Sequence, residues 1–318
     1  QGMQDAGHWQ GEIWNKRKNG EVYPQWLTVN RVTDDTGAVE HFVAVFTDIT
    51  QIKVSQREVE YLATHDSLTG LPNRALFQDH LKHALARGRR HNGRVALLFI
   101  DLDNFKSIND TLGHDIGDEV LKQAALRLRE VVRDTDTIAR LGGDEFTAVL
   151  SDCDGDTADR VGRRIVDDLS ASFQVAGHRL FCSASVGVAF FPDDGTDSAE
   201  LIKKADAAMY RAKEKGRNRV EFFKAEMQVR LLKQATLTSA LREALQKNTL
   251  RLVYQPKYSL EDQPRLVGAE ALLRWNDPVL GNVSPSEFIP VAESNGLILE
   301  VDNRVQELLM AQIRLWLA

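Results

Sequence analysis

The sequence predicts an α+β fold in which helices cover the faces of an antiparallel-rich sheet. Three observations support this class. Helix and strand patterns alternate over residues 66–223. The run "VALLFIDLD", residues 95–103, is apolar enough to be a buried strand. The segment "IARLGGDEFTAVL", residues 138–150, predicts a hairpin, because its two glycines tolerate positive φ between two apolar runs.

Length and composition limit the classes of protein to consider. The 318 residues suffice for about two domains, and a hydrophobic fraction of 43% supports packed cores. The net charge of -6 provides no broad basic face, so we do not expect a nucleic-acid partner. Cys153 and Cys182 lack metal-ligand spacing and are too few for a disulfide framework, which indicates a reducing cytoplasm.

The sequence contains no signal peptide and no apolar run long enough to span a membrane. The chain begins without an initiator methionine, so we expect it to be part of a longer cytoplasmic protein. An anchor that holds this parent at the inner membrane stays an open alternative.

Residues 8–50 predict a β-meander, and residues 51–65 predict a linker helix. The pair Asn19-Gly20 is a strong hairpin signal between the first two strands. Three strands leave one face of a sheet uncovered, so this segment is expected to be half of a domain. In the linker, Ile52 and Val59 fall at coiled-coil spacing, and a packed connector and a dimer stalk remain equal alternatives.

The later elements follow from the same patterns. In the middle of the chain, helices are predicted at 74–90, 118–132, 156–170 and 199–215, and strands at 95–103, 136–140, 145–150, 173–177, 181–191 and 219–223. In the remainder, a helix is predicted from about residue 226, strands at 250–259 and 266–275, and helices at 284–296 and 297–318.

Two acidic residues, Asp101 and Asp103, stand at the end of the buried strand at 95–103. A charge there is costly unless it is paired or bound to a cation, and an N-cap of the next helix would explain Asp103 alone. If this strand lies beside the hairpin, Asp101 and Asp144 meet at one end of the sheet. Paired carboxylates with open coordination positions suit Mg²⁺ that also binds substrate phosphates.

Lys213 and Arg217 lie one turn apart at a helix end. Cations there also neutralise the helix C-terminus, and without further context that explanation would suffice. Beside a metal–phosphate site, these side chains become candidates for binding a triphosphate tail.

Four motifs, "DSLTGLPNR", "DLDNFKSINDTLGHD", "RLGGDEF" and "KADAAMYRAKEKGRNRV", occur in this order. With them, the segment 63–225 resembles the GGDEF family of diguanylate cyclases. The resemblance implies a nucleotidyl-cyclase-like domain of the palm or ferredoxin-like kind. It also implies a reaction in which two GTP molecules form cyclic di-GMP and release two pyrophosphates. Because each protomer would hold one GTP, a homodimer is required for catalysis.

The resemblance also implies roles for individual residues. Asp101, Asp144 and the Leu102 carbonyl would bind Mg²⁺ or Mn²⁺, and Glu145 would be a second-metal ligand or the base for the 3′-hydroxyl. Asn109 and Asp118 would bind the guanine edge. The residues implied in contacts with phosphate are Phe105, Lys106, Lys213 and Arg217, with Gly142 and Gly143 letting the α-phosphate approach the backbone. Lys106 is also a candidate catalytic residue, and His114 is a candidate for substrate binding or a structural role.

The segment "RDTD" places Arg133 and Asp136 shortly before the first glycine of the hairpin. The family carries its RxxD product-inhibition site at this spacing, so the resemblance implies binding of cyclic di-GMP here. An arginine at a helix C-terminus and an aspartate in a turn are the alternative explanation.

The two ends of the chain carry weaker resemblances. Residues 1–50 resemble the C-terminal half of a PAS sensor domain, ending in that family's "DIT". Residues 226–318 resemble the start of the EAL family of cyclic di-GMP phosphodiesterases, on "YQPKYSL", "GAEALLRW" and "FIPVAESNGLI". There the resemblance implies a metal ligand at Glu270 and dinucleotide contacts at Gln255, Leu272 and Arg274. A TIM-type barrel needs about 250 residues, so we expect no phosphodiesterase activity from this chain and a tendency of its uncovered strands to aggregate.

The predicted organisation is a partial PAS domain at 1–50, a linker at 51–65, a GGDEF domain at 66–225 and a partial EAL domain at 226–318. The first functional hypothesis is an active, product-inhibited diguanylate cyclase. The second is a GGDEF domain that binds GTP or cyclic di-GMP and regulates the phosphodiesterase of a bifunctional parent. The third, a scaffold whose acids are solvated, fits four ordered motifs poorly.

Overall fold

The computed structural model describes residues 8–260 and 263–318, and the first seven residues of the predicted partial PAS domain lie outside this description. The chain divides into two compact units, residues 1–222 and 223–318, which are described separately. Within the described ranges, no helix combines the length and the apolar content needed to cross a membrane.

The N-terminal strands form the predicted meander. β1 (His8–Lys16), β2 (Val22–Thr33) and β3 (Val39–Asp48) pair antiparallel in chain order. Every residue of β3 is exposed, including large apolar ones such as Phe42 and Phe46. The linker follows as α2 (Thr50–Thr64), on which the predicted apolar stripe is also exposed. The PAS assignment of the meander stays a prediction.

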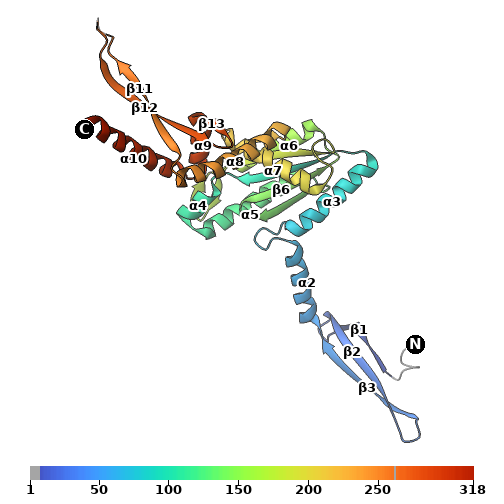
Figure 1. Ribbon diagram of the computed structural model, residues 1–318. Coiled ribbons are helices and arrows are strands. Elements are labelled where there is room, and N and C mark those ends of the chain that lie inside the picture. The colour runs from blue at the N-terminus through green and yellow to red at the C-terminus, as the bar shows by residue number, and fades with distance from the viewer. Residues whose placement is uncertain (1–7, 261–262) are drawn as a thin grey trace. The chain divides into compact units, whose positions relative to one another are not determined.

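A five-stranded sheet forms the centre of the next segment (Figure 1). Its strand order is β10-β9-β4-β6-β5, in which β9 and β10 run parallel and the other neighbours run antiparallel. The strands are β4 (Val95–Leu102), β5 (Thr137–Gly142), β6 (Glu145–Ser151), β9 (Ala184–Phe191) and β10 (Arg219–Phe222). All residues of the central strand β4 are buried, as its apolar sequence predicts. A small hairpin, β7 (Phe173–Val175) with β8 (His178–Leu180), precedes β9.

Helices cover both faces of this sheet. α3 (Arg74–His91) and α7 (Ser198–Glu214) pack on one face, where they also contact each other. α5 (His114–Val131) and α6 (Gly155–Ser170) form the opposite layer, and the short α4 (Phe105–Leu112) packs against α5. Ala96, Leu98 and Ile100 of β4 point into the layer of α5 and α6, because alternate residues of a strand share one face.

Gly187 of β9 allows α7 to lie directly on the sheet. A Cβ atom at this position would stand 2.0 Å from the Met209 backbone nitrogen and 2.1 Å from the Ala205 carbonyl oxygen. The helix backbone therefore occupies the space that a side chain would need. This contact fixes the height of α7 above β4 and β9, and with it the position of the cations at the end of α7.

The second unit contains α8 (Ala225–Gln246), β11 (Leu250–Tyr258), β12 (Leu266–Asp277), β13 (Gly281–Val283), α9 (Pro285–Ser294) and α10 (Ile298–Leu317). Its strands form an antiparallel sheet in chain order, and Trp275 is fully buried in a T-shaped contact with Phe288. The register places Gln255 opposite Glu270, and Lys257 Nζ lies 3.1 Å from Glu270 Oε2. Leu272 and Arg274 share the face of Glu270, because they follow it at even spacing. The barrel expected for this segment stays a prediction.

Candidate active site at the end of β4

The end of β4 and the turn between β5 and β6 meet at one edge of the sheet. Asp101 and Glu145 are register partners, and the Leu102 N–H donates to the Asp144 carbonyl oxygen over 3.3 Å. The turn passes through Gly142 at φ 140° and Gly143 at φ 53°, conformations that favour glycine. The predicted pairing of the hairpin with the buried strand is confirmed, and it brings the acids of both motifs together.

Asp101 is buried at the end of β4, at 6% exposure. The pKa of Asp101 is raised to about 6, mainly by burial, against the opposing effect of Lys213 and with smaller contributions from the charges of Asp144 and Asp103. Lys213, from the last turn of α7, places its Nζ 2.8 Å from Asp101 Oδ1. A cation thus compensates a carboxylate that the fold has removed from water.

This raised pKa predicts a pH dependence of stability in chelator-treated protein. In the folded state Asp101 binds a proton more tightly than in the unfolded state, where its pKa is near 3.8. Folding is therefore favoured below about pH 4, and this contribution is lost as pH rises through about 6. We expect Asp101→Asn to remove a fall in unfolding free energy of up to about 3 kcal/mol between these values, measured by urea titration at each pH. Parallel pH curves for both proteins would contradict this expectation.

Glu145 is half-buried beside two residues that the sequence analysis did not single out. Burial raises the pKa of the Glu145 carboxyl, and Asp206 of α7 adds to this, while Arg74 of α3 opposes it. Arg74 Nη2 lies 3.9 Å from Glu145 Oε2. Asp206 could have been found from its spacing, because it stands seven residues before Lys213 and so on the same helix face.

The carboxylates of Asp101, Asp144 and Glu145 have the donor chemistry that Mg²⁺ or Mn²⁺ prefers. Among the residues that the structure describes, no group of three acidic, histidine or cysteine side chains is close enough together to hold a metal ion. Lys213 provides the charge beside Asp101 in this arrangement. The carboxylates at the end of β4 and in the glycine turn have the donor chemistry for a divalent cation, which would replace the ammonium group next to Asp101.

A second group of predicted residues lies on α4 and α5. Asn109 Oδ1 is buried, and within the described residues it has no hydrogen-bond partner. Phe105 is buried, and Asp118 is half-buried on the neighbouring helix. A Cβ atom at Gly117 would stand 1.9 Å from Asn109 Oδ1, so Gly117 provides the space that this amide occupies. An unpaired buried acceptor fits a ligand that donates hydrogen bonds, as a guanine edge does.

Gly117→Ala is expected to displace the Asn109 side chain without unfolding the protein, because that amide is the flexible group in its way. The affinity for GMP should fall about tenfold with loss of one well-placed hydrogen bond to the base, measured by calorimetry. The melting temperature should stay within a few degrees of wild type. If the affinity for GMP is unchanged in Gly117→Ala, Asn109 does not bind guanine.

The remaining residues predicted to contact substrate are dispersed around this edge. Lys106 on α4 and His114 at the start of α5 are exposed, and their side chains join no cluster described above. Arg217 is also exposed and lies beyond α7, in the left-handed conformation at φ 62°. Of Lys213 and Arg217, Lys213 is the one in contact with the acids.

Asp103 does not cap the next helix, so that alternative is wrong. The N-cap of α4 is Asn104, whose side chain makes no capping hydrogen bond. The Asp103 carboxylate instead accepts hydrogen bonds from Ser183, Ser185 and the Asn218 backbone. The strand β9 is remote in sequence, so no local pattern revealed these partners.

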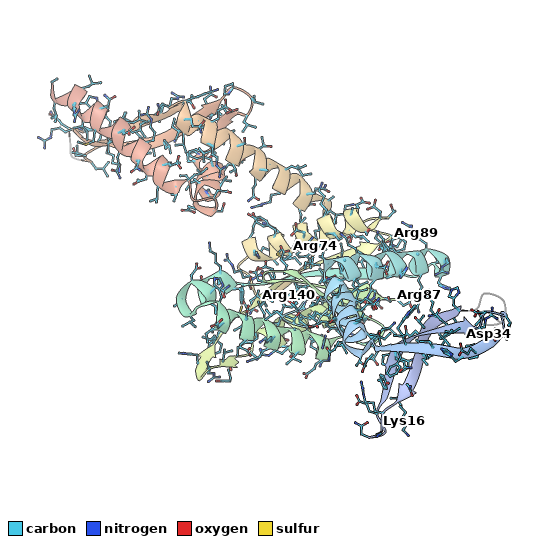
Figure 2. The ribbon with its side chains drawn as sticks, turned by 90° about the horizontal axis from the view of Figure 1, so that it is seen from below. Lys16, Asp34, Arg74, Arg87, Arg89 and Arg140 are labelled. Carbon is cyan, nitrogen blue, oxygen red and sulfur yellow. The ribbon has the colours of Figure 1, made fainter. Side chains whose placement is uncertain are left out.

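Arg140 connects the glycine turn to Asp66 by hydrogen bonds, an arrangement that we call the Arg140 clamp. Its Nη1 lies 2.9 and 3.1 Å from the two carboxylate oxygens of Asp66. Its Nε and Nη2 donate to the Gly143 carbonyl oxygen over 3.0 and 2.7 Å. Arg140 and Arg74 line one pocket beside Gly142, in the region where Figure 2 labels both arginines. Asp66 and Arg140 were both within quoted motifs, but their contact links segments far apart in sequence.

The predicted product-inhibition residues line a separate pocket. Its volume is about 330 Å³, and Arg133 and Asp136 share it with His80 and Arg129. Asp136 accepts hydrogen bonds from the Arg133 and Ser151 backbone nitrogens, as expected of an aspartate in a turn. The Arg133 residue is exposed. Asp136 is therefore the turn residue that the alternative explanation expected, and the exposed Arg133 is accessible to a ligand.

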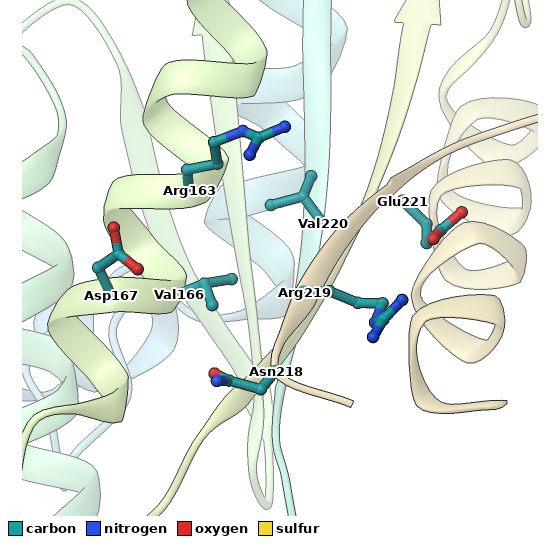
Figure 3. Close-up of a pocket in the computed structure, with 7 residues that line it drawn as sticks. All are labelled: Arg163, Val166, Asp167, Asn218, Arg219, Val220 and Glu221. Carbon is teal, nitrogen blue, oxygen red and sulfur yellow. The ribbon is translucent and has the colours of Figure 1, made fainter. Parts of the chain in front are cut away.

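A further pocket of about 340 Å³ lies between α6 and the edge strand β10 (Figure 3). Its lining includes Arg163, Asp167 and Arg219, and none of the predicted site residues. It lies at the edge of the sheet formed by β10.

The arrangement is an acid-rich site at one edge of an α/β sheet, and comparison with known proteins gives the family of the chain. Residues 63–219 match the family model "Diguanylate cyclase, GGDEF domain", and residues 238–318 match "EAL domain". The GGDEF domain of YfiN from Pseudomonas aeruginosa is 40% identical at a TM-score of 0.52, covering 53% of this chain and 99% of that one. The coiled coil and GGDEF domain of DgcB from Caulobacter crescentus, solved with c-di-GMP, is 28% identical at a TM-score of 0.50, covering 55% and 93%.

The chain belongs to the GGDEF family, and its C-terminal segment is part of an EAL domain. A bifunctional diguanylate cyclase/cyclic di-GMP phosphodiesterase of Pseudomonas aeruginosa, MucR, is 43% identical over 268 residues. That match covers 84% of this chain and 39% of the relative's length. Other matched relatives are named cyclic di-GMP phosphodiesterases. The predicted membership of a GGDEF–EAL protein is confirmed.

Proposed function

We propose that the GGDEF domain of this chain is a diguanylate cyclase that converts two GTP molecules into cyclic di-GMP and two pyrophosphates. The observation that carries this proposal is the set of acids at the end of β4. Asp101, Asp144 and Glu145 gather there, with Lys213 Nζ 2.8 Å from Asp101. Asp101, Asp144, Glu145 and the Leu102 carbonyl would hold Mg²⁺ or Mn²⁺, which when bound neutralises charge on the phosphates.

The residues of the chain would bind and align the substrate. Asn109 and Asp118 would bind the guanine edge, and the buried Asn109 Oδ1 would accept a hydrogen bond from the base. Lys213 and Arg217 would bind the triphosphate tail. The unobstructed space around the two turn glycines supports close approach of the α-phosphate to the backbone.

In each half of the reaction, the 3′-oxygen of one GTP forms a bond to the α-phosphorus of the other. The bond from that phosphorus to the pyrophosphate oxygen breaks, and the leaving group departs with the bonding electrons. As the alternative to its role as a metal ligand, Glu145 would accept the hydroxyl proton, and its half-buried carboxyl has a raised pKa. Two protomers must face each other, so the active species is a homodimer.

The test is incubation of the protein with GTP and Mg²⁺, with separation of the nucleotides over time. Cyclic di-GMP with two equivalents of pyrophosphate supports the proposal. GTP binding by a homodimer without product would overturn it, and would support the alternative of a regulatory GGDEF domain that controls an EAL phosphodiesterase. That alternative is favoured by the EAL segment and by the relatives named phosphodiesterases.

We further propose that Arg133 and Asp136 bind the product and stop the reaction, which is supported by the pocket they line. Arg133→Ala should continue to synthesise cyclic di-GMP after the wild-type protein has stalled, because the exposed guanidinium no longer binds the product phosphates. Progress curves with added cyclic di-GMP measure this, and about a tenfold rise in the inhibitory concentration is expected. Arg160→Ala on α6 is the control and should stall like wild type.

We propose that the N-terminal and C-terminal segments of this chain belong to two further domains of a longer protein. The meander at the N-terminus would be the end of a PAS sensor domain, and the linker would join it to the cyclase in the cytoplasm. Gln255, Glu270, Leu272 and Arg274 share one face of the β11–β12 hairpin, which supports their role in an EAL site. The chain itself would have no phosphodiesterase activity.

A further inference from the structure

The carboxylate of Asp103 connects three segments that are remote in sequence. Asp103 is 3% exposed and follows the last residue of β4. Its Oδ2 accepts from Ser183 Oγ over 2.6 Å and its Oδ1 accepts from Ser185 Oγ over 2.7 Å. The Asn218 backbone N–H donates to Oδ2 over 3.1 Å. A buried carboxylate is thus satisfied by donors from the start of β9 and from the loop after α7.

The loop after α7 has an unusual backbone. Gly216, Arg217 and Asn218 have φ values of 106°, 62° and 48°, so two residues with side chains adopt the left-handed region in succession. Such a backbone persists when surrounding contacts hold it. The hydrogen bond from Asn218 to Asp103 is one such contact, and another runs from Arg219 Nε to the Arg217 carbonyl oxygen over 3.2 Å. Figure 3 shows how Asn218 and Arg219 lead into β10.

The end of β4 therefore contacts the segments that carry Lys213 and Arg217, by different means. Asp101 contacts the Lys213 side chain, and Asp103 contacts the backbone of the residue after Arg217. We propose that Asp103 is a positioning residue, whose hydrogen bond to the Asn218 backbone fixes the loop that presents Arg217 to the triphosphate tail of the substrate. This inference rests on the proposed function and assigns no substrate contact to Asp103 itself.

The test compares two ligands that differ in the tail. Guanosine 5′-(α,β-methylene)triphosphate carries the full tail and cannot lose pyrophosphate, and GMP lacks the β- and γ-phosphates. Asp103→Asn should lower the affinity for the triphosphate analogue about tenfold, and leave GMP affinity within about twofold, because one charge-assisted hydrogen bond is lost. Removal of a negative charge would by itself strengthen binding of an anionic tail. A loss of affinity therefore indicates positioning, and an unchanged or higher affinity overturns the proposal.

Two further variants sharpen the comparison. Asp152→Asn makes the same chemical change at an exposed residue paired with Arg87, and should change neither affinity. Arg217→Ala should weaken the triphosphate analogue in the wild-type background and have less effect in Asp103→Asn, because the guanidinium is already displaced there. Full additivity of the two substitutions would overturn the coupling.

A measurement on the wild-type protein covers the case in which Asp103→Asn does not fold. The Asn218 amide should be protected from hydrogen exchange without ligand, and the triphosphate analogue should protect it further, whereas GMP should not. If the Asn218 amide exchanges at the rate of an exposed amide, Asp103 does not hold the loop and the proposal is overturned. If the wild-type protein binds neither ligand, the proposed function fails, and the ligand-free exchange of Asn218 still decides whether Asp103 anchors the loop.

Discussion

Asp144→Asn is expected to lower the rate of cyclic di-GMP synthesis by about 100- to 1,000-fold, as removal of one preorganised electrostatic group at a reaction centre does. Asp144 precedes Glu145, the register partner of Asp101, and the negative charge of Asp144 raises the pKa of Asp101. An amide of the same shape keeps the turn and removes the charge that a metal-bound phosphate requires. Initial rates of pyrophosphate release measure the effect.

The matched control is Asp152→Asn, which makes the same substitution just after the opposite end of β6. It should retain the wild-type rate. Binding of GMP by Asp144→Asn should also be retained, because the base would be bound by Asn109 and Asp118. Synthesis by Asp144→Asn within tenfold of wild type would remove Asp144 from the proposed site.

Gly187→Ala is expected to destabilise the GGDEF domain by about 3 kcal/mol, since the new methyl group must displace backbone rather than a mobile side chain. The nearest atoms to the added Cβ are the Met209 nitrogen at 2.0 Å and the Ala205 carbonyl oxygen at 2.1 Å. Displacement of α7 would also move Lys213 away from Asp101. The matched control is Gly155→Ala at the first residue of α6, where nothing lies within 4 Å of the new Cβ.

The cysteines provide a probe of this unfolding. Cys153 and Cys182 are each 3% exposed, they belong to the core of the GGDEF domain, and the chain has 2 cysteines. Burial raises the pKa of these thiols to about 11 and about 12, so they are unreactive in the folded state. Thiol labelling against urea concentration therefore reports this domain. Equal midpoints for wild type and Gly187→Ala would contradict the expected overpacking.

Local patterns in the sequence were sufficient for the sheet edge at which the site lies. The apolar run of β4 predicted a buried strand, and the cost of a buried charge at Asp101 predicted a partner for it. The glycines of the turn predicted the hairpin that brings Asp144 alongside. These inferences succeed because each depends on neighbours within a few residues.

Contacts between remote segments were outside the reach of such patterns. The local sequence allowed Asp103 to be interpreted as a helix cap. Its actual partners, Ser183 and Ser185, reach it only through the pairing of β4 with β9. The ion pair of Lys213 with Asp101 depends on the height of α7 above the sheet, which Gly187 sets. Pairing and helix height are properties of the assembled fold.

The Arg140 clamp has a consequence for the peptide group that joins Gly143 to Asp144. The Gly143 carbonyl oxygen is held by two nitrogens of Arg140. In a planar trans peptide the carbonyl and the following N–H point in opposite directions. The Asp144 N–H is therefore directed away from Arg140, and its orientation is fixed before any ligand arrives. The ion pair of Arg140 with Asp66 thus helps to set the direction of a backbone dipole in the glycine turn.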